Sequence, residues 1–125
     1  MKIAVTASGT SLDDPLDPRF GRCAYFMIVE TDTMEFEVVE NSSAELGGGA
    51  GIQSAKIVAG KGASYLLTGN CGPNAHRTLT AAGINVVVGC TGTVKEAVEK
   101  YKAGGLDVSD SANVSSHFGL GPGTE

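Results

Sequence analysis

Three glycine-rich turns, each following an apolar run, are the feature that most restricts the folds open to this chain. They occupy residues 6–10 (TASGT), 68–74 (TGNCGPN) and 89–93 (GCTGT). The apolar runs before them are short, which is typical of strands buried on both faces of a parallel sheet. The carboxyl ends of such strands meet at one edge of an open α/β sheet. We therefore expect this carboxyl edge to be lined by small residues, backbone N–H groups and cysteines.

The order of the other sequence patterns predicts an α/β fold. Five strand patterns and three helical patterns alternate along the chain, at residues 2–8, 24–31, 34–41, 64–68 and 84–88 for the strands and 51–60, 73–82 and 94–103 for the helices. Pro73 suits a first helical turn, and Thr93 with Glu96 predicts a capping box. A strand meander followed by βα units predicts a five-stranded mixed sheet with helices on both faces.

Size, charge and missing motifs exclude several classes of protein. The 125 residues predict one domain, 1–103, and a flexible tail, 104–125, rich in Gly, Ser, Asp and Pro. The net charge of −5 argues against nucleic-acid binding, which needs a basic face. No apolar run approaches the ~20 residues that cross a membrane, and the N-terminus lacks a signal-peptide pattern, so we expect a cytoplasmic protein. No hydrolase, zinc-protease or phosphate-binding motif occurs, so we do not expect an enzyme.

The three cysteines have two interpretations. Cys23, Cys71 and Cys90 lack the close spacing of a zinc finger or ribbon. If the strand at 24–31 runs antiparallel to the first strand, all three lie at the carboxyl edge. Three thiolates there would suit a soft metal or a metal–sulfur cluster. Alternatively, each cysteine is a small buried apolar residue, as free cysteines usually are.

The segment 17–22 (DPRFGR) places two arginines near the same edge. Arg19 and Arg22 suit an anionic ligand through charge-assisted hydrogen bonds. The alternative is a solvated loop in which these arginines neutralise Asp13, Asp14 and Asp17.

The helix start at 73–74 and the turn at 91–92 offer backbone N–H groups and the positive end of a helix dipole. Such a place suits an anion, or it is ordinary turn structure. His76 and His117 are expected at the surface rather than as metal ligands.

The chain resembles a known family in four segments: 1–5 (MKIAV), 17–22 (DPRFGR), the small-residue run before Gly51, and 68–75 (TGNCGPNA). Over residues 1–103 it is similar to the NifX/NifB-like accessory proteins of nitrogenase iron–molybdenum cofactor biosynthesis. Its pattern looks closest to the orange protein branch of sulfate-reducing bacteria. This resemblance implies a three-layer α/β/α fold of the ribonuclease H-like type, without nuclease activity.

The resemblance also implies a function. Members bind or carry metal–sulfur clusters, and the orange protein branch holds a mixed molybdenum–copper sulfide without covalent protein ligands. An iron–molybdenum or iron–sulfur cluster precursor is the alternative cofactor. The alternative function is an α/β interaction module in a multi-protein complex, without its own cofactor. Nitrogenase-branch members tend to have His where this chain has Arg19, and an arginine stays protonated and cannot ligate a metal. We therefore expect capture by charge and hydrogen bonds.

Together, these patterns predict a cofactor-binding surface at the carboxyl edge. Its candidate cofactor-binding residues are Ser8, Gly9, Thr10, Arg19, Phe20, Gly21, Arg22, Asn70, Gly72, Asn74, Thr91 and Gly92. The candidate metal ligands are Cys23, Cys71 and Cys90. No catalytic residue is predicted.

Overall fold

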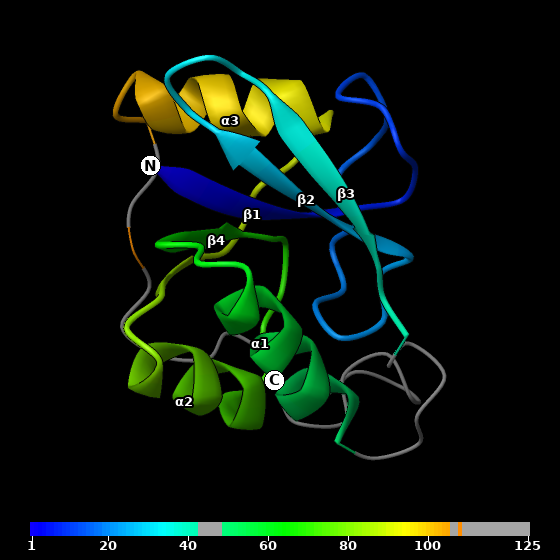
Figure 1. Ribbon diagram of the computed structural model, residues 1–125, viewed down its shortest axis with the longest axis vertical. Helices are drawn as coiled ribbons and strands as arrows, with labels where there is room; N and C mark the ends of the chain where they lie inside the picture. The colour runs from blue at the N-terminus through cyan, green and yellow to red at the C-terminus, as the bar shows by residue number, and fades with distance from the viewer. Residues whose placement is uncertain (43–48, 106–107, 109–125) are drawn as a thin grey trace.

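The computed structural model describes residues 1–42, 49–105 and 108, which form a sheet between two layers of helices (Figure 1). The elements follow one another as β1 (Lys2–Ala7), β2 (Tyr25–Glu30), β3 (Phe36–Glu40), α1 (Ala50–Gly60), β4 (Tyr65–Leu67), α2 (Pro73–Ala81), β5 (Asn85–Val87) and α3 (Val94–Lys102). Helix α3 covers one face of the sheet, and α1 and α2 cover the other.

The five strands lie in the order β3-β2-β1-β4-β5, with β1 at the centre. β1 pairs antiparallel with β2 and parallel with β4, while β2–β3 is antiparallel and β4–β5 parallel. Each step between the parallel strands is made through helices, as βαβ topology requires. The carboxyl ends of β1, β4 and β5 and the start of β2 therefore lie at the same edge of the sheet.

Side chains that alternate along the strands build two separate cores. In β1, Ala4 faces α1 and α2, while Ile3 and Val5 face α3. All three side chains are fully buried. A central strand covered on both faces must be apolar at nearly every position, which explains the unbroken run at the start of the sequence.

Local signals set where the helices begin. Pro73 stands in the first turn of α2, where its missing N–H is not needed. At α3 the Thr93 hydroxyl accepts from the Glu96 N–H, and the Glu96 carboxylate accepts from the Thr93 N–H, which confirms the predicted capping box. In contrast, α1 begins after Gly49, which has a left-handed φ of 77° and no side-chain cap.

The predicted fold class is confirmed, and the element order is as expected. Strand and helix ends differ by one or two residues from the expected ones. Phe36 and Val38 pair with Val29 and Met27 of β2, so they share one face as the alternation predicts, although Phe36 is 42% exposed. Phe36 lies in β3, which is an edge strand of the described sheet and pairs only with β2.

Parts of two predicted segments lie outside the described residues. These are most of the glycine-rich loop before α1 and most of the predicted tail, 104–125, including His117. Within the described part of the chain, no helix is long and apolar enough to cross a membrane.

The segment between β1 and β2, residues 8–22, folds across the carboxyl edge and is called the edge loop below. It passes so close to the end of β4 that a Cβ on Gly69 would lie 2.6 Å from Pro18 Cβ and 2.7 Å from Pro18 Cα. Only glycine fits this crossing without movement of the backbone.

We predict that Gly69→Ala destabilises the fold by about 1–3 kcal/mol, because the new methyl group overlaps the edge loop. Chemical denaturation monitored by circular dichroism measures the change. Gly60→Ala is the matched control, because a Cβ there meets nothing within 4 Å. Equal stability of the two variants would contradict the close crossing.

Candidate functional site

The edge loop is held to the ends of three strands by backbone contacts. The Leu16 N–H donates to the Gly92 carbonyl (2.9 Å), which ties the loop to the turn after β5. The Asn70 N–H donates to the Pro18 carbonyl (2.7 Å), which ties it to the turn after β4. Isolated bridges also join Ala7 to Leu16, Pro15 to Thr93 and Arg19 to Asn70. The three glycine-rich turns therefore meet at one edge, as the sequence predicts.

A pocket of about 500 Å³ opens between the edge loop and the start of α3. Pro15, Leu16 and Pro18 form its wall on the side of the edge loop. The other wall is formed by Cys90, Thr91, Gly92, Thr93 and Glu96. Its surface is mainly apolar, and Glu96 is the one ionisable carboxylate in the lining.

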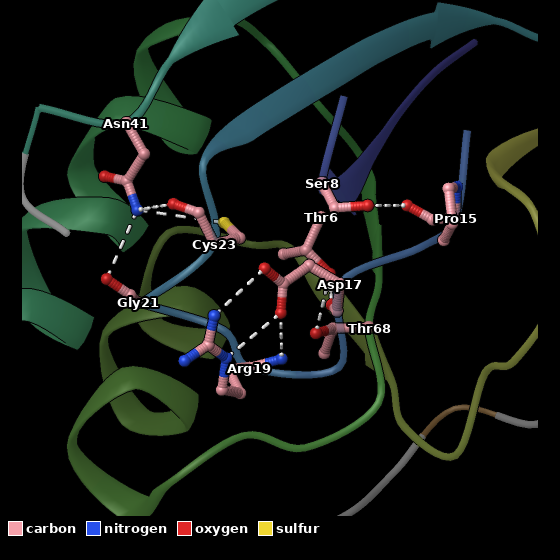
Figure 2. A network of polar contacts seen from close by, with 9 residues as sticks. All are labelled: Thr6, Ser8, Pro15, Asp17, Arg19, Gly21, Cys23, Asn41 and Thr68. Carbon is pink, nitrogen blue, oxygen red and sulfur yellow. Dashed lines mark hydrogen bonds and ion pairs between the residues drawn. The ribbon is translucent and has the colours of Figure 1, made fainter. Parts of the chain in front are cut away.

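A buried polar network fixes the edge loop to the centre of the sheet (Figure 2). The Asp17 N–H donates to the Thr6 carbonyl (2.9 Å). The Thr6 hydroxyl donates to the Asp17 carbonyl (2.5 Å) and lies 2.9 Å from the Thr68 hydroxyl. Both threonines are fully buried. Buried hydroxyl groups need such partners, so these contacts define one position of the loop.

The Asp17 carboxylate holds Arg19. Its Oδ1 accepts from the Arg19 N–H (3.0 Å) and from Arg19 Nε (3.3 Å), and its Oδ2 lies 3.5 Å from Nη2 (Figure 2). The Asp17 side chain is 8% exposed, whereas that of Arg19 is 53% exposed. The arginine therefore has one side on a buried carboxylate and the rest of its guanidinium in solvent.

A second buried network closes the far end of the edge loop (Figure 2). Asn41 Nδ2 donates to the carbonyls of Gly21 (3.2 Å) and Cys23 (2.9 Å), and the Ser54 hydroxyl donates to Asn41 Oδ1 (3.3 Å). Gly21 has a φ of +98°, and a Cβ there would lie 3.2 Å from the Gly51 backbone. Glycine is thus required where the loop contacts α1.

The structure does not bring the three cysteines together as metal ligands. Cys23 and Cys71 belong to the core under α1 and α2, whereas Cys90 belongs to the core under α3. In residues 1–42, 49–105 and 108, no group of three or more His, Cys, Asp or Glu side chains is arranged to hold a metal ion. The two cores lie on opposite faces of the sheet, so the sheet separates Cys90 from Cys23 and Cys71.

The three thiols are buried, and burial raises the pKa of each. Burial raises the pKa of Cys23 to about 12, and the nearby Asp17 carboxylate adds to this effect against a hydrogen bond from Asn41. Burial likewise raises the pKa of Cys71 to about 12 and raises that of Cys90. A metal ligand must be a thiolate, so this environment disfavours ligation.

The two helix N-termini at the carboxyl edge differ. Glu96 already occupies the N-terminus of α3 through the capping box, so an added anion at the 91–92 turn would face its carboxylate. The N-terminus of α2 at Gly72 has no side-chain cap, and Asn74 is exposed beside it. Of the two places expected to suit an anion, α2 therefore has the more favourable electrostatics.

The other predicted site residues fall into exposed and buried groups. Ser8, Thr10, Thr91 and Gly92 are exposed at the edge, with Gly9, Arg22, Asn70 and Gly72 partly exposed. Phe20 and Gly21 are buried, and Phe20 packs 5.9 Å from Phe26 between ring centroids. These two residues therefore shape the loop and do not present a surface to a ligand. The expectation of a surface position for His76 is wrong: it is 8% exposed, because it lies on the inner side of α2.

Sequence reasoning missed the pocket wall. The sequence patterns give Pro15 and Leu16 no role, include Pro18 only as part of the segment 17–22, and give Glu96 the role of a capping residue. The only signal in the sequence is that Leu16 lies between Pro15 and Pro18. This spacing does not predict which strand ends the loop crosses.

Comparisons with known proteins show the family to which the chain belongs. Residues 1–104 match the family model described as dinitrogenase iron-molybdenum cofactor. The apo form of the orange protein (ORP) from Desulfovibrio gigas is 45% identical, with a TM-score of 0.88, over 90% of this chain and 95% of that one. A candidate NifB protein from Thermotoga is 36% identical, with a TM-score of 0.75, over 86% of this chain and 91% of its own.

A sequence relative gives the same result. An uncharacterised protein of Methanocaldococcus jannaschii is 33% identical over 110 residues, which are 86% of this chain and 90% of that protein. The chain therefore belongs to the dinitrogenase iron–molybdenum cofactor family. The family is associated with binding of metal–sulfur cofactors.

We predict that the three thiols differ in reactivity with Ellman's reagent at pH 8. Cys90 is 4% exposed and lines the pocket, whereas Cys23 and Cys71 are 0% and 1% exposed. Cys90 should react first, and all three should react in guanidinium chloride. Cys90→Ala is the control and should remove the fast phase. Labelling of Cys23 or Cys71 at the rate of Cys90 would contradict the described burial.

Proposed function

We propose that this protein binds and carries an anionic metal–sulfide cluster at its carboxyl edge and has no catalytic activity of its own. The cluster proposed is a mixed molybdenum–copper sulfide, held without covalent protein ligands. Membership of the cofactor family and the similarity to the orange protein support the class of ligand. The geometry of the edge loop supports the place.

One observation carries the proposal: the same edge loop supplies a wall of an apolar pocket and, at the next residue in sequence, an exposed arginine. Pro18 lines the pocket, and the next residue, Arg19, has a half-exposed guanidinium. A thiometallate is a large anion whose sulfide surface is soft and weakly hydrated. Apolar walls suit the sulfide surface, and a guanidinium suits the charge.

The donor set also favours capture without covalent bonds. Cys90 is the cysteine in the pocket lining, and burial raises the pKa of its thiol, which disfavours the thiolate that a metal needs. Arginine cannot ligate a metal, because it stays protonated. The remaining contacts available to an anion are the guanidinium, hydroxyl groups and backbone N–H groups at the turns.

Two carboxylates influence where an anionic ligand would bind within the site. Glu96 lies on the α3 wall of the pocket and Asp17 lies under Arg19. Repulsion from Glu96 favours an anion on the side of Pro15 and Pro18, where the edge loop continues into Arg19. The uncapped start of α2 near Gly72 contributes further positive potential at the same edge.

The first test is reconstitution with tetrathiomolybdate and copper without oxygen, followed by gel filtration. The proposal expects a coloured protein whose charge-transfer bands elute with the chain. A colourless protein fraction would contradict it for this cluster.

We predict that Arg19→Gln weakens tetrathiomolybdate binding by about tenfold to hundredfold, because it removes a charge-assisted contact. Absorption titration measures the Kd. Lys102→Gln is the matched control, because it makes the same change in net charge at the opposite end of α3. An equal effect of both variants would mean that net charge alone drives binding.

We predict that the double variant Cys71→Ala, Cys90→Ala retains full cluster content. The measurement is molybdenum, copper and sulfide analysis after reconstitution, alongside the wild type. Because the variant lacks two of the three candidate thiol ligands, loss of the metals with the fold intact would show that thiolate ligation is needed.

A further inference from the structure

Asp17 is a buried carboxylate whose position is set by the centre of the sheet. It is 6% exposed, and a carboxylate at such a site is costly unless it is hydrogen-bonded and paired. Its backbone N–H and carbonyl both bind Thr6 of β1. The position of the carboxylate is therefore fixed by the sheet and does not depend on the conformation of the Arg19 side chain.

The contact between Asp17 and Arg19 uses one side of the guanidinium (Figure 2). Nε and Nη2 face the carboxylate at 3.3 and 3.5 Å. The end of the fork, formed by Nη1 and the outer N–H of Nη2, points away from this contact, because the guanidinium is planar. Within the described residues, no acceptor is recorded for Nη1. Two parallel N–H groups at that end match the geometry that anions accept from arginine.

Charge alone cannot explain a carboxylate in this place. Asp17 offsets part of the positive charge of Arg19, which weakens the attraction for any anion. At 3.3 and 3.5 Å the side-chain contact is a loose ion pair, and the Arg19 N–H, which donates to the same carboxylate at 3.0 Å, keeps that carboxylate beside the guanidinium. What the contact supplies is orientation, since a long side chain that is already ordered loses less entropy when a ligand binds.

We propose that Asp17 is a positioning residue for the anion site: it orders Arg19 so that the free end of the guanidinium meets the ligand. This inference rests on the proposed function, because it assigns the anion to Arg19. Asp17 itself does not touch the ligand. The affinity gained by orienting Arg19 exceeds the affinity lost through the charge that Asp17 cancels. Removing the Asp17 charge should therefore weaken anion binding, whereas electrostatics alone predicts that it strengthens binding.

The test compares Asp17→Asn with Asp13→Asn in titrations with tetrathiomolybdate. In Asp17→Asn the side-chain carbonyl oxygen can still accept from the Arg19 N–H. The side-chain NH₂ group then faces Arg19 Nη2, and because both groups are hydrogen-bond donors, this contact is lost. Asp13→Asn makes the same change in charge on the same loop, at an exposed residue whose carboxylate makes no hydrogen bond or ion pair within the described part of the chain. We expect Asp17→Asn to raise the Kd about threefold to tenfold, and Asp13→Asn to leave it unchanged or lower it. A lower Kd for both variants would overturn the proposal.

Two further measurements do not depend on how well Asp17→Asn folds. Arg19→Lys keeps the charge but has no fork, so it should weaken binding as much as Asp17→Asn does. Equal binding by wild type and Arg19→Lys would overturn the proposal. In the unliganded wild type, the NMR signal of Arg19 Nε–H should exchange with water more slowly than that of exposed Arg77.

The exchange measurement also separates two failures. If the wild type does not bind tetrathiomolybdate, the proposed function is wrong for that anion. Slow exchange at Arg19 then still supports the ordering of its side chain by Asp17. Exchange as fast as at Arg77 shows that Asp17 does not order the arginine, whatever ligand the edge binds.

Discussion

The hydrogen bonds between Thr6 and Asp17 join the central strand to the loop that crosses its end. Because the Asp17 N–H and carbonyl both bind Thr6, the edge loop has one register on the sheet. That register places Pro15 and Pro18 opposite the turn after β5, which creates the pocket. It also places the Asp17 carboxylate beneath Arg19. The shape of the candidate site and its charge thus depend on the same pair of residues.

The site combines features that are individually common in α/β proteins. Strand ends, glycine turns and helix N-termini gather at the carboxyl edge of many open sheets. This chain adds an arginine on a buried support and a pocket wall made of proline and leucine. On the proposed function, an apolar wall and an arginine on the same loop would select for a ligand that is both anionic and poorly hydrated. A sulfide cluster has both properties, whereas phosphate is anionic but strongly hydrated.

The sequence was sufficient for the fold because the local signals are strong and agree with one another. The apolar run at Ile3–Val5, Pro73 at the start of α2 and the Thr93–Glu96 capping box each predict one local structure, and the structure confirms them. The site was harder to predict, because it depends on which groups share one side of an element. Cys71 and Cys90 lie in the turns after the neighbouring strands β4 and β5, yet they belong to different cores. The alternation of side chains along a strand does not predict which core a cysteine enters when it lies several residues beyond the end of that strand.

The most direct measurement is a ¹H–¹⁵N NMR titration of the folded protein with tetrathiomolybdate and copper. The account predicts shifts concentrated in the edge loop, above all at Arg19, and in the turns that follow β4 and β5. Little change is expected at Glu30, Tyr65 and Tyr101, which lie toward the opposite edge of the sheet. Shifts centred on those residues, or no saturable shifts at all, would contradict the claim that the carboxyl edge binds the cluster.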